Sequence, residues 1–558
     1  MQQKTDRRNL ARRITVTVVA LVIAVAATLA VYFQDELRSR YSRWRYPRIV
    51  LVTFDTLAVG FTGPYNSDVE FTPHLSALAA EGVVFFRAYT TVPITLPSHA
   101  SLLAGKSPAE LGVMVNGDEV QDWIETLPEM LQQRGYRTAA FTSLGVLQAE
   151  FNLDQGFDFY DRSAAPRNLR WYRTADEVFE SARQWISENA EEPFFVWVHF
   201  SDPHEPYVLK SAPPDAELTL DGEVIGQWNL TTKERQVVQI SLPPGSHELT
   251  WSSIRPPRED DRAETSLRLA LFKPEGLAPW LSNPPADLTA EKDLSTPFTL
   301  ELENGKDETI SFRVGFTGRT GDPGHSEVWE NYQLEVEYSD RYFGELREYF
   351  RALEKDQGTL WVVVSDHGEG LFRQGALGHA SYSYEDQLRI LWMMSGPGIP
   401  QGKIIEDDFV VIEDVLPTIL DLLRLGIPGD LSGLSQRGCW RRSGCAERDE
   451  WWAYGVEHDA DGTPRISAVA GYQPPLKVMW RQRRSPRFFN LLDDPWEEEN
   501  LGTIFKNKPQ HVPPEFKRLT RELGRKVQHF EGSLERRSWM SLDAEKQELL
   551  RSLGYLGN

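Results

Sequence analysis

The strongest constraint on the fold is a set of five short apolar runs, each of strand length, separated by stretches with helical periodicity. Runs without polar alternation indicate strands buried on both faces, and their alternation with amphipathic helices predicts a three-layer α/β domain on a mainly parallel sheet. The expected strands are 48–54, 138–143, 194–200, 359–365 and 388–394, and the expected helices lie near 73–81, 97–104, 174–189, 330–354 and 413–425.

Between Val208 and His325 the helical periodicity gives way to short segments that alternate polar and apolar residues, such as 216–226 and 298–303. Turn formers, among them Asp221-Gly222, lie between these segments. The pattern is typical of antiparallel strands joined by tight turns. It predicts an inserted antiparallel β-sandwich that interrupts the α/β domain.

An uncharged stretch of 20 residues at 14–33 has the length needed to cross a bilayer and predicts a transmembrane anchor. A cleaved signal peptide and a buried core helix are the alternatives. Five basic residues precede the stretch and five follow it, so simple charge bias does not orient it. A short, densely basic tail resists export, which favours a single-pass protein with a cytoplasmic N-terminus and a periplasmic or extracellular catalytic domain.

These observations divide the chain into six segments. The expected boundaries are a cytoplasmic tail at 1–13, the anchor at 14–33, a linker at 34–47, the catalytic domain at 48–207 and 326–558, the latter including a C-terminal subdomain, and the insert at 208–325.

Charge and cysteine content narrow the partners and the compartment. A net charge of −22 argues against a nucleic-acid partner, because phosphate backbones are bound by clustered Lys and Arg. The two cysteines, Cys439 and Cys445, are close in sequence and indicate a local disulfide in an exported domain, with two unpaired thiols as the alternative.

Three of the expected strands end in an acid: Asp55, Asp202 and Asp366. His367 follows the last of these directly, and His204 lies two residues after Asp202. Ligands of open α/β sheets bind at the carboxyl ends of the strands, so these side chains can converge there. A single Asp in such a place is more often a helix cap or turn residue, but three with two histidines predict a metal site suited to Zn or Mn.

Five segments of the chain share their pattern with one known family: 72–90, 95–108, 201–207, 365–371 and 488–501. They resemble the sulfatase family of the alkaline phosphatase superfamily. The resemblance covers both halves of the α/β domain, skips the insert, and implies an alkaline-phosphatase-like three-layer sandwich that hydrolyses esters with a metal ion.

The family's catalytic motif is Cys or Ser, any residue, Pro, Ser, Arg, and its first residue is converted to formylglycine. In this chain the motif reads Thr95-Leu96-Pro97-Ser98-His99. Threonine cannot be converted, so the resemblance implies attack by the Thr95 hydroxyl itself, activated by a metal. Related enzymes with Thr at this place act on phosphodiesters and phosphonates or transfer phospho-head groups.

Carried over residue by residue, the resemblance implies that Asp55, Asp366 and His367 hold the metal with Thr95 as a fourth partner. Asp202 is a further candidate ligand. The expected cofactor is one or two divalent ions, Zn, Mn or Ca.

The remaining candidates surround the substrate. His204 would face the substrate or a second metal, and His379 would contact the transferred group or assist the leaving group. Lys106 fills the place of a family Arg. His99 stands where sulfatases keep a catalytic Arg and is either an active-site group or a structural helix residue, and the family's Lys-any-His pair has no counterpart.

The sequence therefore predicts a hydrolase of phosphodiester, phosphonate or sulfate esters. A glycan or a lipid head group is the candidate molecule that bears the ester. One alternative is a transferase that passes a lipid-derived head group to an acceptor. Another is a non-catalytic glycan-binding protein with a relic site, which the joint retention of Asp55, Thr95, Asp366 and His367 argues against.

Overall fold

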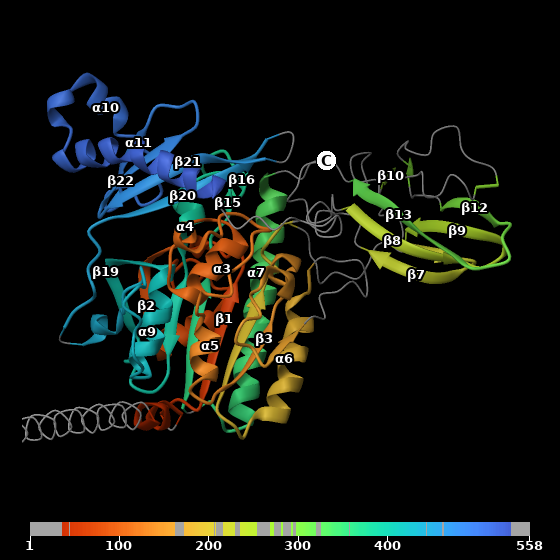
Figure 1. Cartoon of the computed structure of the whole chain (residues 1–558). Coiled ribbons are helices and arrows are strands. Elements are labelled where there is room, and N and C mark those ends of the chain that lie inside the picture. The colour runs from red at the N-terminus through yellow and green to blue at the C-terminus, as the bar shows by residue number, and fades with distance from the viewer. Residues whose placement is uncertain are drawn as a thin grey trace, which may run out of the picture.

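The computed structural model (Figure 1) describes residues 36–43, 45–161, 172–205, 207, 216–228, 235–253, 268–272, 281–282, 292–293, 297–319, 325–356, 358–441, 443–459 and 463–536. The expected tail and anchor at 1–33 and the expected start of the insert at Val208 lie outside this set. Within it, no helix combines the length and the apolarity needed to cross a bilayer.

A nine-stranded sheet forms the centre of the molecule, in the order β17-β2-β18-β14-β1-β5-β3-β4, with β19 paired to β2. Its strands are β1 Arg48–Phe54, β2 Val83–Tyr89, β3 Arg137–Phe141, β4 Phe159–Asp161, β5 Phe194–Phe200, β14 Thr359–Ser365, β17 Arg389–Ile390, β18 Trp392–Ser395 and β19 Lys403–Val411. Strand β1 is buried along its whole length and pairs in parallel with β14 and β5. In both pairs Phe54 is level with the last residue of the neighbour, Ser365 or Phe200, so the residues that follow these strands meet at one edge.

The sheet differs from the expected one in two places. The expected strand 388–394 is divided at Leu391 into β17 and β18, because the Leu391 carbonyl accepts from the Ser365 N–H instead of continuing a ladder. Strand β18 runs antiparallel to β14 and β2, so the sheet is more mixed than predicted. Strand β2 was not expected, because only Gly82 separates it from helix α2 and no turn cluster marks its start.

Helices cover both faces of the sheet. Ile49 and Leu51 of β1 belong to an apolar cluster with Leu102 of α3, and Val50 belongs to another with Phe343 of α7, as expected when alternate side chains of a strand point to opposite faces. The helices on the first face are α3 Thr95–Ala104, α5 Leu127–Gln132 and α9 Val415–Leu422, and those on the second are α2 Pro73–Glu81, α6 Ala175–Asn189 and α7 His325–Ala352. The domain is a three-layer α/β structure.

The described residues between β5 and α7 form two four-stranded antiparallel sheets, which Figure 1 shows to one side of the α/β body. Their strand orders are β11-β10-β13-β8 and β12-β9-β6-β7. The strands are β6 Ala216–Leu220, β7 Glu223–Trp228, β8 Arg235–Leu242, β9 Gly245–Ser253, β10 Arg268–Phe272, β11 Lys292–Asp293, β12 Phe298–Asn304 and β13 Ile310–Arg319. Leu249 and Trp251 of one sheet and Val238 and Ile240 of the other are buried, which matches the alternation seen in the sequence.

A further antiparallel sheet, near the C-terminus, lies over the edge where the central strands end (Figure 1). Its order is β20-β21-β22-β23, with bounds Trp451–His458, Pro464–Gln473, Leu476–Arg481 and Arg487–Asn490, and helices α10 Gly502–Asn507 and α11 Pro514–Glu535 follow it. Backbone hydrogen bonds from Tyr454 to Thr91 and from Val456 to Ala380 join it to the α/β domain. Cys439 and Cys445 are disulfide-bonded in the loop before β20.

Four short elements complete the edge near the site. They are α4 Pro108–Leu111, β15 Gly370–Leu371, β16 Leu377–Gly378 and α8 Glu385–Leu388.

Candidate active site

Two carboxylates meet because the strands that carry them are neighbours. Asp55 follows β1 and Asp366 follows β14, and the Asp366 N–H donates to the Phe54 carbonyl at 3.2 Å. Thr56 has a φ of 55°, an unusual conformation for a β-branched residue. Its N–H donates to Oδ1 of Asp366 at 3.1 Å, and its carbonyl accepts from the Tyr332 hydroxyl at 2.7 Å. These contacts hold the strained turn that orients both acids.

Asp55, Asp366 and His367 form a buried cluster whose candidate ligand atoms all lie within 4.8 Å of one another. The His367 Nδ1–H donates to the Gly368 carbonyl at 3.0 Å, which leaves Nε2 as the nitrogen with a lone pair. Among the described residues, both Asp55 oxygens, Asp366 Oδ2 and His367 Nε2 lack a hydrogen-bond partner. Buried polar atoms are rarely left in this state, so the donor set fits a divalent cation.

The electrostatics of the cluster support the same conclusion. Burial and the Asp55 charge raise the pKa of Asp366 well above its usual value. Burial also raises the pKa of Asp55, but the close approach of the His199 ring and the charges of His204 and His367 outweigh it, and the net pKa is lowered. Two adjacent buried carboxylates repel each other unless a cation lies between them.

Helix α3 begins at Thr95, the predicted nucleophile. The Thr95 side chain is fully buried, and its hydroxyl has no hydrogen-bond partner among the described residues. The following N–H, from Leu96, donates to Oδ1 of Asn116 at 2.9 Å. The N-terminus of a ten-residue helix carries a partial positive charge that favours an anionic group. Ser98 joins α3 to the Asp-Asp-His cluster through a 2.7 Å hydrogen bond to the Asp366 carbonyl.

His99 lies one turn into α3 and is fully buried. Its Nδ1–H donates to the Thr95 carbonyl at 2.8 Å, which makes Nε2 the acceptor in a neutral ring. Nε2 lies 3.2 Å from the Thr53 hydroxyl, which also accepts from Trp197 Nε1 at 2.8 Å. Burial lowers the pKa of His99 to about 3. His99 therefore does not replace the charge of the family's Arg, and its hydrogen bonds position the backbone of Thr95.

The sequence did not single out His199, the polar residue in the apolar strand β5. Its Nδ1 accepts from the Ser143 N–H at 3.3 Å, so Nε2 carries the proton, and Nε2 lies 3.5 Å from Oδ2 of Asp55. The ring therefore orients Asp55. A lone histidine in a fully buried strand was the signal that could have revealed it.

Two further histidines adjoin the cluster. The His379 ring lies 4.6 Å from that of His367 and 5.0 Å from that of His204, measured between centroids. His379 Nδ1 lies 3.1 Å from Oε2 of Glu369, another residue not singled out, although it follows His367 by two positions in the family-like segment. Burial would lower the pKa of His379, but the Glu369 carboxylate raises it to about 9.

Asp202 and Lys106 are not brought into the metal cluster. The Asp202 oxygens accept from the Ala175 N–H at 3.0 Å and the Ser339 hydroxyl at 3.1 Å, so this acid caps α6. Lys106 lies beyond the far end of α3, which is about 15 Å long, and its ammonium pairs with Asp430 at 2.5 Å. A carboxylate that caps a helix and one that binds a metal look alike in sequence, since both follow a strand.

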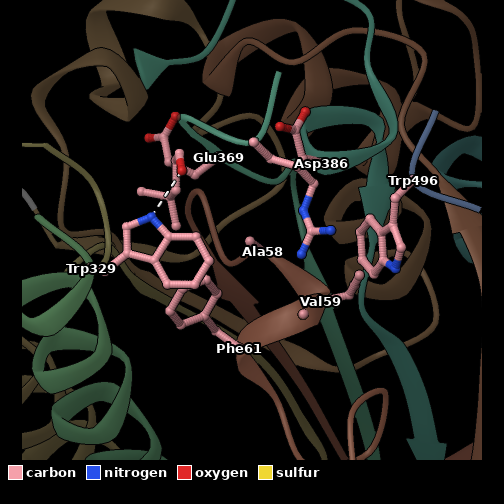
Figure 2. A pocket seen from close by; sticks show the side chains of 10 residues that line it. Ala58, Val59, Phe61, Trp329, Glu369, Asp386 and Trp496 are labelled. Carbon is pink, nitrogen blue, oxygen red and sulfur yellow. Dashed lines mark hydrogen bonds between the residues drawn. The ribbon is translucent and has the colours of Figure 1, made fainter. Parts of the chain in front are cut away.

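A narrow pocket adjoins Glu369 (Figure 2). It measures about 30 Å³, room for about two water molecules. Figure 2 shows Trp329 and Phe61 on one side and Trp496 on the other, with Glu369 and Asp386 above them in the view. Asp386 Oδ1 has no hydrogen-bond partner among the described residues.

The fold is a three-layer α/β structure, and its buried Asp-Asp-His cluster is a possible metal-binding site. The family model for sulfatases matches residues 47–425, more than half of the chain. The chain therefore belongs to the sulfatase family of ester hydrolases.

Known proteins resemble the chain over most of its length. An arylsulfatase of Clostridium perfringens is 24% identical, with 82% of this chain and 90% of the relative covered. An endo-4-O-sulfatase of Bacteroides thetaiotaomicron is 24% identical, with 66% of each covered.

Two solved structures share the fold. A protein in complex with its substrate D-glucosamine-2-N,6-O-disulfate has a TM-score of 0.58 and 17% identity, covering 87% of this chain and 98% of that one. The phosphonate monoester hydrolase of Agrobacterium radiobacter has a TM-score of 0.54 and 16% identity, covering 89% and 98%.

Proposed function

We propose that the chain hydrolyses monoanionic esters of phosphorus or sulfur with the Thr95 hydroxyl as the nucleophile. The observation that carries the proposal is the Thr95 hydroxyl itself, which is buried at the start of α3 without a hydrogen-bond partner among the described residues. Ser98 and His99 of the same helix contact Asp366, so the helix start is tied to the metal cluster. A hydroxyl in this place can attack an ester bound at the cluster.

Asp55, Asp366 and His367 would hold the metal ion, with the Thr95 oxygen as a fourth ligand. A divalent cation there supplies positive charge that lowers the pKa of the nucleophile and offsets charge on the ester. Zn, Mn and Ca are the candidate ions, and the cluster supplies two carboxylates and one imidazole nitrogen. His204, whose Nδ1–H donates to the Glu205 carbonyl at 2.7 Å, would direct Nε2 toward the substrate or a second ion.

His379 is the candidate for proton transfer. Because Glu369 holds Nδ1, the other ring nitrogen remains for the oxygen of the leaving alcohol. Thr95 would first lose its hydroxyl proton to water. Its oxygen then forms a bond to the central atom as the bond to the leaving oxygen breaks, and His379 supplies the proton that the leaving oxygen needs. A Thr95 ester has no second hydroxyl to expel the bound group, so its release requires attack by water on the central atom, with His379 taking up the proton.

The charge of the site favours substrates with a single negative charge. His99 replaces the family's Arg and is kept neutral by burial, so one cation is lost from the place where sulfatases bind oxyanions. Phosphodiesters, phosphonate monoesters and sulfate esters are monoanions. Among the relatives and structural neighbours, the named activities include those of an arylsulfatase, an endo-4-O-sulfatase and a phosphonate monoester hydrolase, and one neighbour binds a sulfated sugar, so a sugar is the leading candidate for the leaving alcohol.

A panel of nitrophenyl esters tests the proposal. The full chain is stripped with a chelator and assayed with added Zn, Mn or Ca against a sulfate, a phosphodiester, a phosphonate and a phosphate monoester. We expect metal-dependent hydrolysis of the monoanionic esters and slower hydrolysis of the dianionic phosphate monoester. Hydrolysis that survives the chelator, or a preference for the phosphate monoester, would contradict the proposal.

We propose in addition that residues 14–33 anchor the chain in a membrane, with the catalytic domain on the periplasmic or extracellular side. The support is the uncharged stretch of 20 residues. Protease added to intact cells should remove the catalytic domain. Full protection of the domain, or recovery of a mature chain that begins after 33, would contradict the anchor.

A further inference from the structure

The C-terminal sheet carries a basic pocket that the catalytic chemistry does not use. It lies at the turn between β22 and β23 and encloses about 320 Å³. Arg481, Arg484, Arg487 and Asn500 are among the residues that line it. A cavity of this size accommodates a ligand rather than a few waters.

The three arginines stand out because they are not neutralised. No carboxylate within ion-pair distance of their guanidinium groups is found among the described residues, although the chain as a whole has a net charge of −22. Arginines on a strongly acidic protein usually find such partners. Three guanidinium groups around one cavity therefore form a local positive potential that attracts anions.

Two of the arginines are held in place by aromatic residues. Nη1 of Arg481 and Nη1 of Arg487 donate to the Tyr384 hydroxyl at 3.2 and 3.0 Å, and Tyr384 is itself buried. The Arg481 guanidinium also lies over the Tyr382 ring, 4.1 Å from its centroid. Fixed guanidinium groups with several free donors are well suited to the tetrahedral oxyanions of sulfate and phosphate groups.

The pocket is connected to the active site by a short segment. Tyr384 lies five residues after His379, so their Cα atoms are at most about 17 Å apart. The same segment is tied to the C-terminal sheet by the hydrogen bond from Val456 to the Ala380 carbonyl. An anionic chain several sugars long can therefore contact the arginines while one of its esters lies at Thr95.

We infer that this pocket binds a second sulfate group on a polysulfated glycan whose reacting ester occupies the active site. The inference rests on the proposed ester hydrolase function for its link to turnover, but the binding itself does not require catalysis. Arg484 is the best probe, because it lines the cavity and its guanidinium forms no hydrogen bond or ion pair with the described residues. Arg483 is the matched control, since it is exposed in the same turn and does not line the cavity.

Binding is measured by calorimetry on the full chain carrying Thr95→Ala, with short dextran sulfate as the probe and unsulfated dextran as its control. The Kd for dextran sulfate does not depend on turnover. The binding result can therefore be interpreted even if Thr95 is not the nucleophile. We expect Arg484→Ala and Arg487→Ala each to raise the Kd for dextran sulfate about tenfold, as for loss of a charge-assisted contact, and Arg483→Ala to change it less than about twofold. Unsulfated dextran should not bind.

Three outcomes would overturn the inference. Equal effects of Arg483→Ala and Arg484→Ala would show diffuse attraction by surface charge. Unchanged binding in the Arg484 and Arg487 variants, with melting temperatures that confirm folding, would place the glycan elsewhere. The same variants are also tested for binding to vesicles of anionic phospholipid. If Arg484→Ala and Arg487→Ala weaken binding to the vesicles but not to dextran sulfate, the pocket is a lipid headgroup site.

Discussion

At the scale of single residues, the hydrogen bonds of the histidines fix which ring nitrogen is free for chemistry. His367 donates through Nδ1 to a carbonyl and presents Nε2 to the metal cluster. His99 uses both nitrogens within the protein core and has none left for a substrate. Residues of the same type therefore divide into one candidate ligand and one positioning residue.

The role of His99 predicts a coupled effect on stability. His99→Phe removes the side-chain donor to the Thr95 carbonyl and the acceptor of the Thr53 hydroxyl, and it should lower the free energy of unfolding by about 1–3 kcal/mol. Trp197→Phe removes the neighbouring donor in the same chain of hydrogen bonds. Urea denaturation of both variants and of the double variant should give non-additive losses. Additive losses would mean that the three groups do not act as a unit.

His379 should affect turnover without affecting metal content. His379→Ala removes the proposed proton donor but none of the three clustered ligands, so kcat should fall roughly 10²–10⁴-fold while the bound metal is retained. Asp366→Ala is the comparison and should lose metal and activity together. Elemental analysis of the two purified proteins checks this. A metal-free His379→Ala protein would make His379 a ligand and indicate a second ion.

At this scale the sequence was informative where a residue's role follows from its place at a strand end. Asp55 and Asp366 were predicted to converge, and the parallel register of β1 and β14 brings them together. Asp202 satisfied the same criterion, but its oxygens are used by α6 and Ser339, which only tertiary contacts reveal. His199 and Glu369 act on other site residues, and a motif search for ligands does not find such supporting groups.

At the scale of elements, a buried lysine joins the C-terminal sheet to the edge of the α/β domain. Lys477 of β22 pairs with Glu385 of α8 at 3.0 Å and with Glu497 at 2.7 Å, and all three side chains are buried. Lys477→Met would leave two buried carboxylates without a cation, which should cost about 3–5 kcal/mol of stability. Lys506→Met in the exposed part of α10 is the control.

Thermal and urea denaturation measure this effect. Lys477→Met combined with Glu497→Gln should recover part of the loss, because one of the stranded charges is removed. If Lys477→Met is no more destabilising than Lys506→Met, the buried ion pairs do not hold the sheet in place.

The elements that periodicity predicts well are those with a uniform environment. Strands β1, β5 and β14 are buried on both faces and apolar throughout, and they lie where the sequence predicted them. Strand β2 follows α2 after a single glycine, and β19 mixes exposed, half-buried and buried positions without a regular alternation. Composition alone therefore could not show where either strand begins and ends.

At the scale of the whole molecule, the inserted β-sandwich should be removable. The chain leaves the α/β domain near Tyr207 and returns in α7, and Asn331 of α7 donates to the Tyr207 carbonyl at 3.1 Å, so the two ends lie close together. Replacing 208–324 with a short Gly-Ser linker should leave a folded core that still binds metal. Soluble expression, a cooperative melting transition and metal content check this. An aggregated or metal-free product would contradict the boundary.

The central claim is that Thr95 forms a covalent intermediate, and mass spectrometry of the quenched enzyme tests it most directly. The metal-loaded full chain is mixed with a phosphodiester, quenched with acid and digested. The account predicts an adduct on the peptide that contains Thr95, with the mass of a phosphoryl group that still carries the second ester group of the substrate. It also predicts no adduct and almost no turnover for Thr95→Ala with its metal retained, and measurable turnover for Thr95→Ser. An unmodified Thr95 together with normal turnover by Thr95→Ala would contradict the account and assign the attack to water.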